Sequence, residues 1–248
     1  MADVDVSAAN KAFVPLENNP EVMSSLVHTL GVSSSLAFHD VYSLDDPTML
    51  SFVPRPASAL LLVFPVTNTY ETFRQSEDSA LPEYSGSGAS EPVIWFKQTI
   101  RNACGLIGLL HAVSNGAAKE MITEGSDLDK LLKDAIPLSP KDRADLLYES
   151  KALESAHSDA ATRGDTKAPD AEDQTELHFV CFVKQGDELW ELDGRRKGPL
   201  YRGKLAENED VLSDKGLDLG VKSFLKREEE AGGGELRFSC IALGPSLD

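Results

Sequence analysis

The sequence lacks the features that direct a chain to a membrane or an oxidising compartment. Its longest strongly apolar run, Ala59 to Phe64, is far too short to cross a bilayer and is typical of a buried strand. The first five residues are acidic and do not resemble a signal peptide. The 3 cysteines are odd in number and widely spaced, which argues against a disulfide framework. We therefore expect a reduced protein of the cytoplasm, and also of the nucleus, with no membrane contact.

Positive charge is scarce as well. Lys and Arg total 24 against 41 Asp and Glu, for a net charge of −17. Binding of nucleic acid needs clustered Lys and Arg, so this balance argues against a nucleic-acid partner. An acidic surface suits a partner that presents positive charge, although such surfaces also simply keep proteins soluble.

Motifs for metals and nucleotide cofactors are missing too. The sequence has no CxxC pair, no HExxH, no P-loop, and no GxGxxG after a predicted strand. The one dense basic run, Arg195 to Lys197, is predicted to be a solvated turn. We expect a protein that uses neither a metal nor a cofactor.

The 248 residues are enough for a single domain, residues 1–248, with a full core. The clearest element is a helix that follows Asn19, a favourable N-cap, with Pro20 at its first position and Gly31 after its end. Helices are also predicted at residues 128–136, 142–156 and 221–230, and strands at 36–42, 59–66, 177–183, 188–193 and 235–243. Helices dominate the first half and strands the second, which predicts an α+β fold with a largely antiparallel sheet.

Two polar segments are predicted to be loops. Residues 76–90 are rich in Ser, Gly and Glu and are typical of a surface loop. Residues from about 155 to 175 contain almost nothing to bury, which predicts a mobile loop of roughly twenty residues. Loops of that length inside a domain are usually functional.

Cys104 lies at the start of a predicted helix. Apolar residues repeat at helical spacing from Ala103 to Val113, so one face of this helix belongs to the core. Asn102 is the expected N-cap, which places Cys104 in the first turn, where free N–H groups and the helix dipole favour a thiolate. The amide of Gln98 and the backbone N–H of Cys104 would form an oxyanion hole. The alternative is a small buried cysteine, the commoner role of a free cysteine.

A nucleophilic cysteine needs a base, and the sequence has 5 histidines. His111 lies on the same helix but seven residues further on, about 10 Å along the axis, which is beyond hydrogen-bond reach. Three others fall in a predicted helix, near a predicted strand and at the edge of the polar loop, where a structural or solvated role is expected: His28, His39 and His157.

His178 has the better position. Its strand is followed by a predicted hairpin turn, and if Lys184 pairs with Asp187 then His178 falls directly opposite Asp193. Side chains opposite each other on one face have Cβ atoms roughly 5 Å apart, so the carboxylate can orient the imidazole. Cys104, His178 and Asp193 would then form a catalytic triad. Such a pair can also be merely structural, and a one-residue change of register would place the two on opposite faces.

Several segments, in order along the chain, resemble the ubiquitin C-terminal hydrolase family. Its active-site signatures around the cysteine, histidine and aspartate match residues 98–105, 177–179 and 190–194, and further matches lie at residues 15–20, 40–42 and 235–238. The resemblance covers nearly the whole chain. The family's four catalytic positions fall on Gln98 (oxyanion hole), Cys104 (nucleophile), His178 (general base and acid) and Asp193 (which orients His178).

The resemblance implies a papain-like fold, in which a central antiparallel sheet is flanked by helices, with a knotted chain and a crossover loop at about 155–175. It implies a deubiquitinating thiol hydrolase that removes small or unfolded adducts from the C-terminal glycine of ubiquitin, whose basic tail suits the acidic chain. The loop would limit the size of the leaving group. Ubiquitin contacts are expected at Pro15, Leu16, Glu17, Asn18, Asn19, Pro20, Ala161, Thr162, Arg163, Gly164, Asp165, Thr166, Lys167, Ala168 and Glu235.

Two departures from the family's pattern avoid the catalytic positions: Leu106 stands where many relatives have Thr, and Arg195 to Lys197 is unusually basic. The absence of a long extension after the last strand is similar to the short, single-domain members, and we expect a monomer. Two alternatives stay open. The first alternative to a ubiquitin hydrolase is a binding module that sequesters ubiquitin with little turnover. The second is a hydrolase that prefers a ubiquitin-like protein such as NEDD8.

Overall fold

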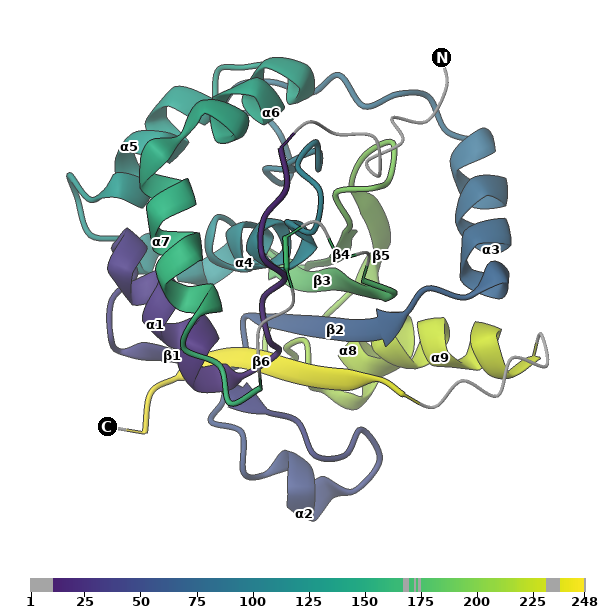
Figure 1. Cartoon of the computed structure of the whole chain (residues 1–248). Helices are drawn as coiled ribbons and strands as arrows, with labels where there is room; N and C mark the ends of the chain where they lie inside the picture. Colours follow the sequence, from purple (N-terminus) through teal and green to yellow (C-terminus); the bar gives the residue numbers. More distant parts are fainter. Residues whose placement is uncertain (1–10, 167–169, 172, 174, 231–236, 248) are drawn as a thin grey trace.

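A six-stranded antiparallel sheet forms the centre of the protein (Figure 1). The computed structural model describes residues 11–166, 170–171, 173, 175–230 and 237–247. The strand order is β1-β6-β2-β3-β4-β5, so the last strand in sequence lies between the first two. The strands are β1 (Leu36–Asp40), β2 (Ala59–Pro65), β3 (Leu177–Gln185), β4 (Glu188–Leu192), β5 (Leu200–Lys204) and β6 (Ser239–Pro245). Every neighbouring pair is antiparallel, which confirms the predicted α+β class.

Helices cover both faces of the sheet (Figure 1). Their bounds are α1 (Pro20–Leu30), α2 (Pro47–Leu50), α3 (Asn68–Ser79), α4 (Cys104–Val113), α5 (Asp127–Ala135), α6 (Pro140–Glu149), α7 (Lys151–Ala161), α8 (Asp214–Leu219) and α9 (Val221–Glu230), with a 3₁₀ helix at Gly116–Met121. One core contains α1, α4, α5 and α7 together with alternate residues of β2 and β3, such as Leu61 and Cys181. The other contains residues of α3, α8 and α9 with the intervening positions, such as Leu62 and Val180. Among the described residues no helix is both long and apolar enough to span a membrane.

The first helix begins and ends where its caps predict. Asn19 Oδ1 accepts hydrogen bonds from the backbone N–H groups of Glu21 and Val22, at 2.9 and 3.3 Å, and Pro20 occupies the first position. Gly31 follows in a left-handed conformation with φ of 113°, which costs a glycine little because it has no Cβ.

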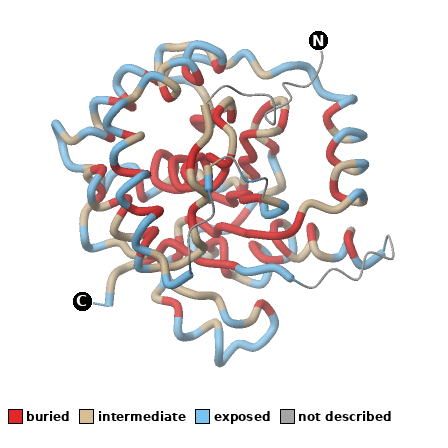
Figure 2. The backbone as a smooth tube through the Cα atoms, in the orientation of Figure 1, coloured by how far each residue is buried: buried red, intermediate tan, exposed pale blue. Residues whose placement is uncertain are grey.

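The helix α4 lies directly against the sheet and is buried along its whole length (Figure 2). Two glycines permit this close approach. A Cβ at Gly105 would lie 3.2 Å from Leu16, and one at Gly108 would lie 3.2 Å from Leu61. Since Cys104 is the first residue of this helix, the packing of α4 on β2 and β3 fixes the position of the thiol relative to the sheet.

Three predictions about local structure were wrong. Residues 76–79 belong to α3 rather than to a loop, because ion pairs with distant arginines stabilise a helix that has little apolar surface of its own. The predicted helix 142–156 is two helices that meet at Ser150, which ends α6 and whose hydroxyl caps α7. The predicted mobile loop therefore starts later, because α7 continues to Ala161 with His157 buried.

The predicted hairpin register was also wrong. Gln185 pairs with Glu188, and Gly186 lies between them with φ of 60°, as two-residue hairpin turns require. The ladder is therefore offset by two residues from the predicted one. An offset of two leaves each side chain on the same face of the sheet, so His178 and Asp193 still share a face. They meet diagonally beyond the last β3–β4 pair, Cys181 with Leu192.

Candidate active site

Cys104 is the first residue of α4, but Asn102 is not its cap. The capping position is Ala103, and no side chain in the described part of the protein caps this helix. Asn102 instead adopts a left-handed conformation with φ of 59°, which asparagine tolerates better than most residues. Its amide donates to the carbonyl oxygens of Ala171 and Asp173, both at 3.0 Å. The first-turn N–H groups near the thiol therefore remain available to a ligand.

His178 and Asp193 form a buried pair beside this helix start. His178 Nε2 lies 2.8 Å from Asp193 Oδ1, and both side chains are almost fully buried. Cys104 is one of the groups that raise the pKa of His178, so the thiol lies close to the imidazole, and Cys104 Sγ lies 4.0 Å from the carbonyl oxygen of Leu177. With Nε2 engaged by the carboxylate, Nδ1 is the ring nitrogen left to exchange a proton with a thiol.

The charges of this pair support each other. Burial opposes protonation of His178, but Asp193 and Cys104 outweigh it and raise the pKa of His178 to about 9. Burial also opposes ionisation of Asp193, yet His178, Tyr70 and Arg196 together hold the pKa of that carboxyl well below its usual range. At neutral pH the pair is therefore an imidazolium and a carboxylate.

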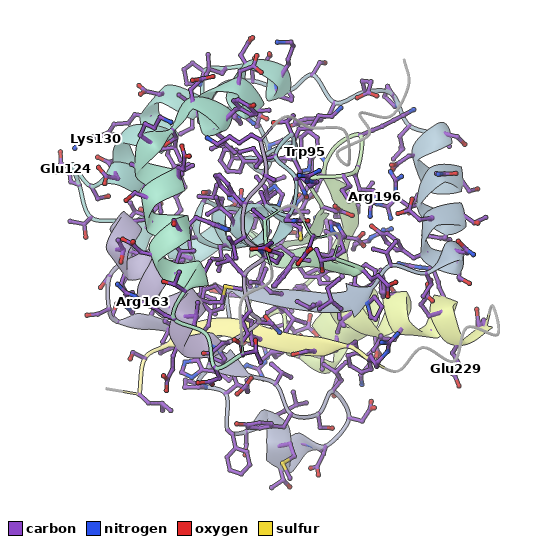
Figure 3. All side chains as sticks on the ribbon, in the orientation of Figure 1. Trp95, Glu124, Lys130, Arg163, Arg196 and Glu229 are labelled. Atoms are coloured by element: carbon purple, nitrogen blue, oxygen red, sulfur yellow. The ribbon has the colours of Figure 1, made fainter. Side chains whose placement is uncertain are left out.

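Gln98 is held close to the same pair by the backbone. Its N–H donates to the carbonyl oxygen of Gly194 at 2.9 Å, and the indole Nε1 of Trp95, labelled in Figure 3, donates to the carbonyl oxygen of Asp193 at 3.0 Å. The side-chain amide is buried, and its Nε2 donates to the carbonyl oxygen of Ile100 at 3.2 Å. An amide nitrogen carries two hydrogens, so the second one can bind a developing oxyanion.

The other four histidines have structural partners. Nε2 of His28 and of His39 each lie near a backbone carbonyl oxygen, at 2.7 and 2.9 Å. His157 Nε2 lies 2.7 Å from the carbonyl oxygen of Val14, and burial lowers the pKa of His157 to about 4. His111 Nε2 accepts the N–H of Phe96, and burial lowers its pKa to about 3. The geometry thus favours His178 over every alternative.

A pocket of about 220 Å³ has Cys104 in its wall. Three parts of the chain that were predicted to meet at the site line it together: the segment before α1, the end of α7 with the residues after it, and the start of β3. The lining residues are Pro15, Leu16, Glu17, Asn18, Val63, Asn102, Cys104, Ala161, Thr166, Thr175, Leu177 and Phe179.

The segment after α7 is hydrogen-bonded to the segment before α1. Glu17 Oε2 accepts the N–H and the hydroxyl of Thr166, both at 3.1 Å. Asn19 donates to Asp165 at 3.2 Å, and Arg163 donates to Ser25 at 3.2 Å. Together with the bonds from Asn102, these contacts hold the described residues after α7 beside the pocket.

Some of the residues predicted to contact ubiquitin line the Cys104 pocket, and others lie elsewhere. Pro15 to Asn18, Ala161 and Thr166 line the pocket. Asn19 and Pro20 begin α1, and Thr162 follows the end of α7. Arg163, Gly164 and Asp165 lie beside residues before or within α1. Lys167, Ala168 and Glu235 lie outside the described residues.

The basic run at 195–197 is not a solvated turn, which corrects that prediction. Arg196, labelled in Figure 3, is 2% exposed. Its Nη1 lies 2.8 Å from Glu77 and 3.1 Å from Asp78, and its Nη2 lies 3.5 Å from Glu191. Three carboxylates compensate the buried charge. The sequence did not reveal this burial because two of the three partners, Glu77 and Asp78, lie more than a hundred residues away in α3.

Tyr70 is a second residue that the sequence analysis missed. Its hydroxyl donates to Asp193 Oδ2 at 2.6 Å, and the residue is 3% exposed. A Thr N-cap at residue 67, followed by aromatics at 70 and 73, was the available sequence signal for this helix.

Within the described residues, no group of three or more His, Cys, Asp or Glu side chains is placed to bind a metal ion.

The comparisons with known proteins agree with this geometry. The family model described as ubiquitin carboxyl-terminal hydrolase, family 1, matches residues 13–223. Ubiquitin carboxyl-terminal hydrolase YUH1 of Saccharomyces cerevisiae is 35% identical over 98% of this chain and 100% of its own. Isozyme L1 of Rattus norvegicus is 38% identical over 92% of this chain and 96% of its own. Hydrolase 3 of Arabidopsis thaliana is 37% identical over 98% of both.

Among solved structures, the UCH37 catalytic domain of Trichinella spiralis bound to ubiquitin vinyl methyl ester superposes with a TM-score of 0.72. The superposition covers 98% of this chain and 99% of the other at 19% identity, and therefore supports the fold. On the family model and on relatives that match along nearly their whole length, this chain belongs to the ubiquitin carboxyl-terminal hydrolase family.

Proposed function

We propose that this protein is a deubiquitinating cysteine hydrolase that releases small or unfolded groups from the C-terminal glycine of ubiquitin. The observation that carries the proposal is the placement of Cys104. It lies at an uncapped helix start, in the wall of a pocket, and in contact with a buried His178–Asp193 pair. Relatives of 35–38% identity are named for this hydrolysis.

The reaction follows from the roles of these groups. The thiolate of Cys104 attacks the carbonyl carbon of the terminal glycine, and Gln98 Nε2 and the N–H of Cys104 bind the oxyanion. The protonated His178 then gives its proton to the leaving amine, and a thioester remains on Cys104. A water molecule gives a proton to His178 and attacks the thioester, which returns the thiolate and releases the carboxylic acid, whose proton passes to the solvent. Asp193 keeps the proton on Nε2, so that Nδ1 faces the reaction.

The shape of the pocket bears on which adducts are released. The bonds from Thr166 to Glu17 and from Asn102 to residues 171 and 173 hold the described residues of this span beside the pocket that contains Cys104. A tail that threads under this span leaves room for a small or extended leaving group. Folded ubiquitin chains would then be poor substrates.

Three finer points are part of the proposal. NEDD8 is a second candidate substrate, because a ubiquitin-like tail would present the same chemistry. We infer a monomer, since the triad is assembled within one chain. A reducing compartment, the cytoplasm or the nucleus, stays our prediction for its location.

The first test is reaction with ubiquitin that carries a C-terminal electrophile, followed by intact mass. We expect one adduct on the wild type and none on Cys104→Ser. Cys240→Ala is the matched control, because Cys240 is buried and burial raises its pKa to about 12; it should react like the wild type. Binding without an adduct would favour a sequestering module. An adduct with the equivalent NEDD8 reagent, but none with the ubiquitin reagent, would mean that the substrate is NEDD8 rather than ubiquitin.

A further inference from the structure

The carboxylate of Asp193 is held from both sides. Its Oδ1 faces His178 Nε2 at 2.8 Å and accepts the N–H of Arg195 at 2.8 Å. Its Oδ2 accepts the hydroxyl of Tyr70 at 2.6 Å. A carboxylate bonded through one oxygen only can turn about its Cβ–Cγ bond, whereas bonds to both oxygens fix the plane of the group.

Tyr70 is in turn held in place by its own surroundings. It lies in the first turn of α3, where its N–H donates to the capping hydroxyl of Thr67 at 3.0 Å. Its ring meets Phe64 edge-on at 4.8 Å and lies 5.7 Å from Phe224. These ring contacts fix the side chain of Tyr70, so its hydroxyl stays directed at Asp193 Oδ2.

The helix that carries Tyr70 is anchored to the chain just after Asp193. Arg195 pairs with Glu71 at 2.6 Å, and Arg196 pairs with Asp78 at 3.1 Å. Arg202 donates to Glu77 at 2.8 Å. Three arginines that follow Asp193 in sequence thus bind three carboxylates of α3, so this helix and Asp193 form one buried unit.

From this arrangement we propose that Tyr70 is a positioning residue of the reaction. Its hydroxyl sets the orientation of Asp193, and through Asp193 it sets the position and charge of His178. Tyr70 is absent from the lining of the Cys104 pocket, so it acts on the chemistry rather than on substrate binding. The inference rests on the proposed function and deepens it.

The consequence is a specific kinetic change. Without the hydroxyl, Asp193 Oδ2 is buried without its donor and the carboxylate can rotate away from Nε2. The imidazolium of His178 then loses stabilisation, and a smaller fraction of the enzyme holds the reactive thiolate–imidazolium pair. For Tyr70→Phe we expect kcat to fall roughly tenfold with KM within about twofold, the size typical for loss of a bond to a charged group.

A test that needs no ubiquitin uses iodoacetamide, with the alkylated cysteine identified by peptide mass. In Tyr70→Phe, alkylation of Cys104 at pH 6 should slow by roughly fivefold relative to the wild type, while the rate at pH 9 stays within about twofold. A merely structural role would lower both rates together, and that result, or an unchanged ratio, would overturn the proposal. Because the reagent is not a substrate, failure of the proposed function would leave this test valid.

Tyr84→Phe is the matched control. Its hydroxyl also donates to a carboxylate, Glu91 Oε2 at 2.9 Å, but outside the site. This variant should keep the wild-type ratio of the two alkylation rates and the wild-type kcat.

A measurement on the wild type covers the case in which Tyr70→Phe does not fold. With the 5 tyrosines labelled at Cζ, one carbon signal should titrate together with the imidazole of His178, near pH 9. The same signal should lose that titration in His178→Gln. If no tyrosine signal follows His178, Tyr70 is not coupled to it and the inference is wrong.

Discussion

Different kinds of interaction fix the two halves of the candidate active site: apolar packing on the cysteine side, and hydrogen bonds and buried charges on the histidine side. Cys104 begins a helix whose ten residues are all buried and mostly apolar, so packing against β2 and β3 fixes the nucleophile. His178 and Asp193 lie on the other face of the sheet among Tyr70, Arg196 and the carboxylates of α3. There, hydrogen bonds and buried charges fix the base.

The difference matters because packing and polar networks fail in different ways. Loss of an apolar contact lowers stability over the whole pH range, since no charge is involved. Loss of a group in a buried polar network leaves a partner unsatisfied and changes protonation as well as stability. A variant on the cysteine side should therefore change the free energy of unfolding, and one on the histidine side should also change how activity depends on pH.

The largest effect is expected from removal of the base. His178→Gln should lower kcat by roughly a thousandfold or more with little change in binding, because no other described histidine reaches Cys104. Turnover of a ubiquitin C-terminal amide reporter measures it. His39→Gln, which alters a histidine bonded only to the carbonyl oxygen of Pro245, should stay within about twofold of the wild type. Activity retained in His178→Gln would remove His178 from the mechanism.

On the cysteine side, Leu110→Ala tests packing alone. Leu110 is 0% exposed in the middle of α4, and such truncations cost about 2–5 kcal/mol. Chemical denaturation at pH 6, 7 and 8 should show the same loss at each pH. A loss that varied strongly with pH would mean that α4 is coupled to the charged half.

The histidine side should show pH-dependent stability. The pKa of His178 rises from 6.5 to about 9 on folding, so its contribution is complete below pH 6.5 and is lost as the pH rises through 9. We expect the free energy of unfolding to fall by on the order of 2 kcal/mol over this interval. The fall should be absent from the curve of His178→Gln, so the difference between the two curves should show it. Parallel curves for the two proteins would contradict the raised pKa.

The smallest effect concerns the link between the halves. Asn102→Gly keeps the left-handed backbone but removes the amide that binds the carbonyl oxygens of Ala171 and Asp173. Proteolysis within residues 162–175 should be several-fold faster, while the free energy of unfolding changes by less than about 1 kcal/mol. Unchanged proteolysis would show that these bonds do not restrain the loop.

Local signals in the sequence were sufficient for the cysteine side. Asn19, Pro20 and Gly31 set the ends of α1, and the apolar repeat after Ala103 gave α4. The histidine side depends on contacts between residues far apart in sequence. Apart from the capping Thr67, local signals did not indicate α3 or the burial of Arg196, because the helix and Arg196 are stabilised by each other across more than a hundred residues.

The His178–Asp193 contact was predicted from a register that was wrong by two residues. Its two-residue turn lies one residue further along the chain than expected, at Gly186 and Asp187, yet the period of two along a strand kept both side chains on one face. The catalytic roles, the knotted path and the ubiquitin contacts remain predictions, and the variants above test the catalytic roles.

The position of β6 has a consequence for biosynthesis. This strand lies between β1 and β2, which begin 203 and 180 residues before it. Until residues 239–245 emerge from the ribosome, β1 has no partner strand and β2 has an open edge. Closing so long a separation is slow, so a nascent chain can complete its sheet, and with it the active enzyme, only after residues 239–245 have emerged.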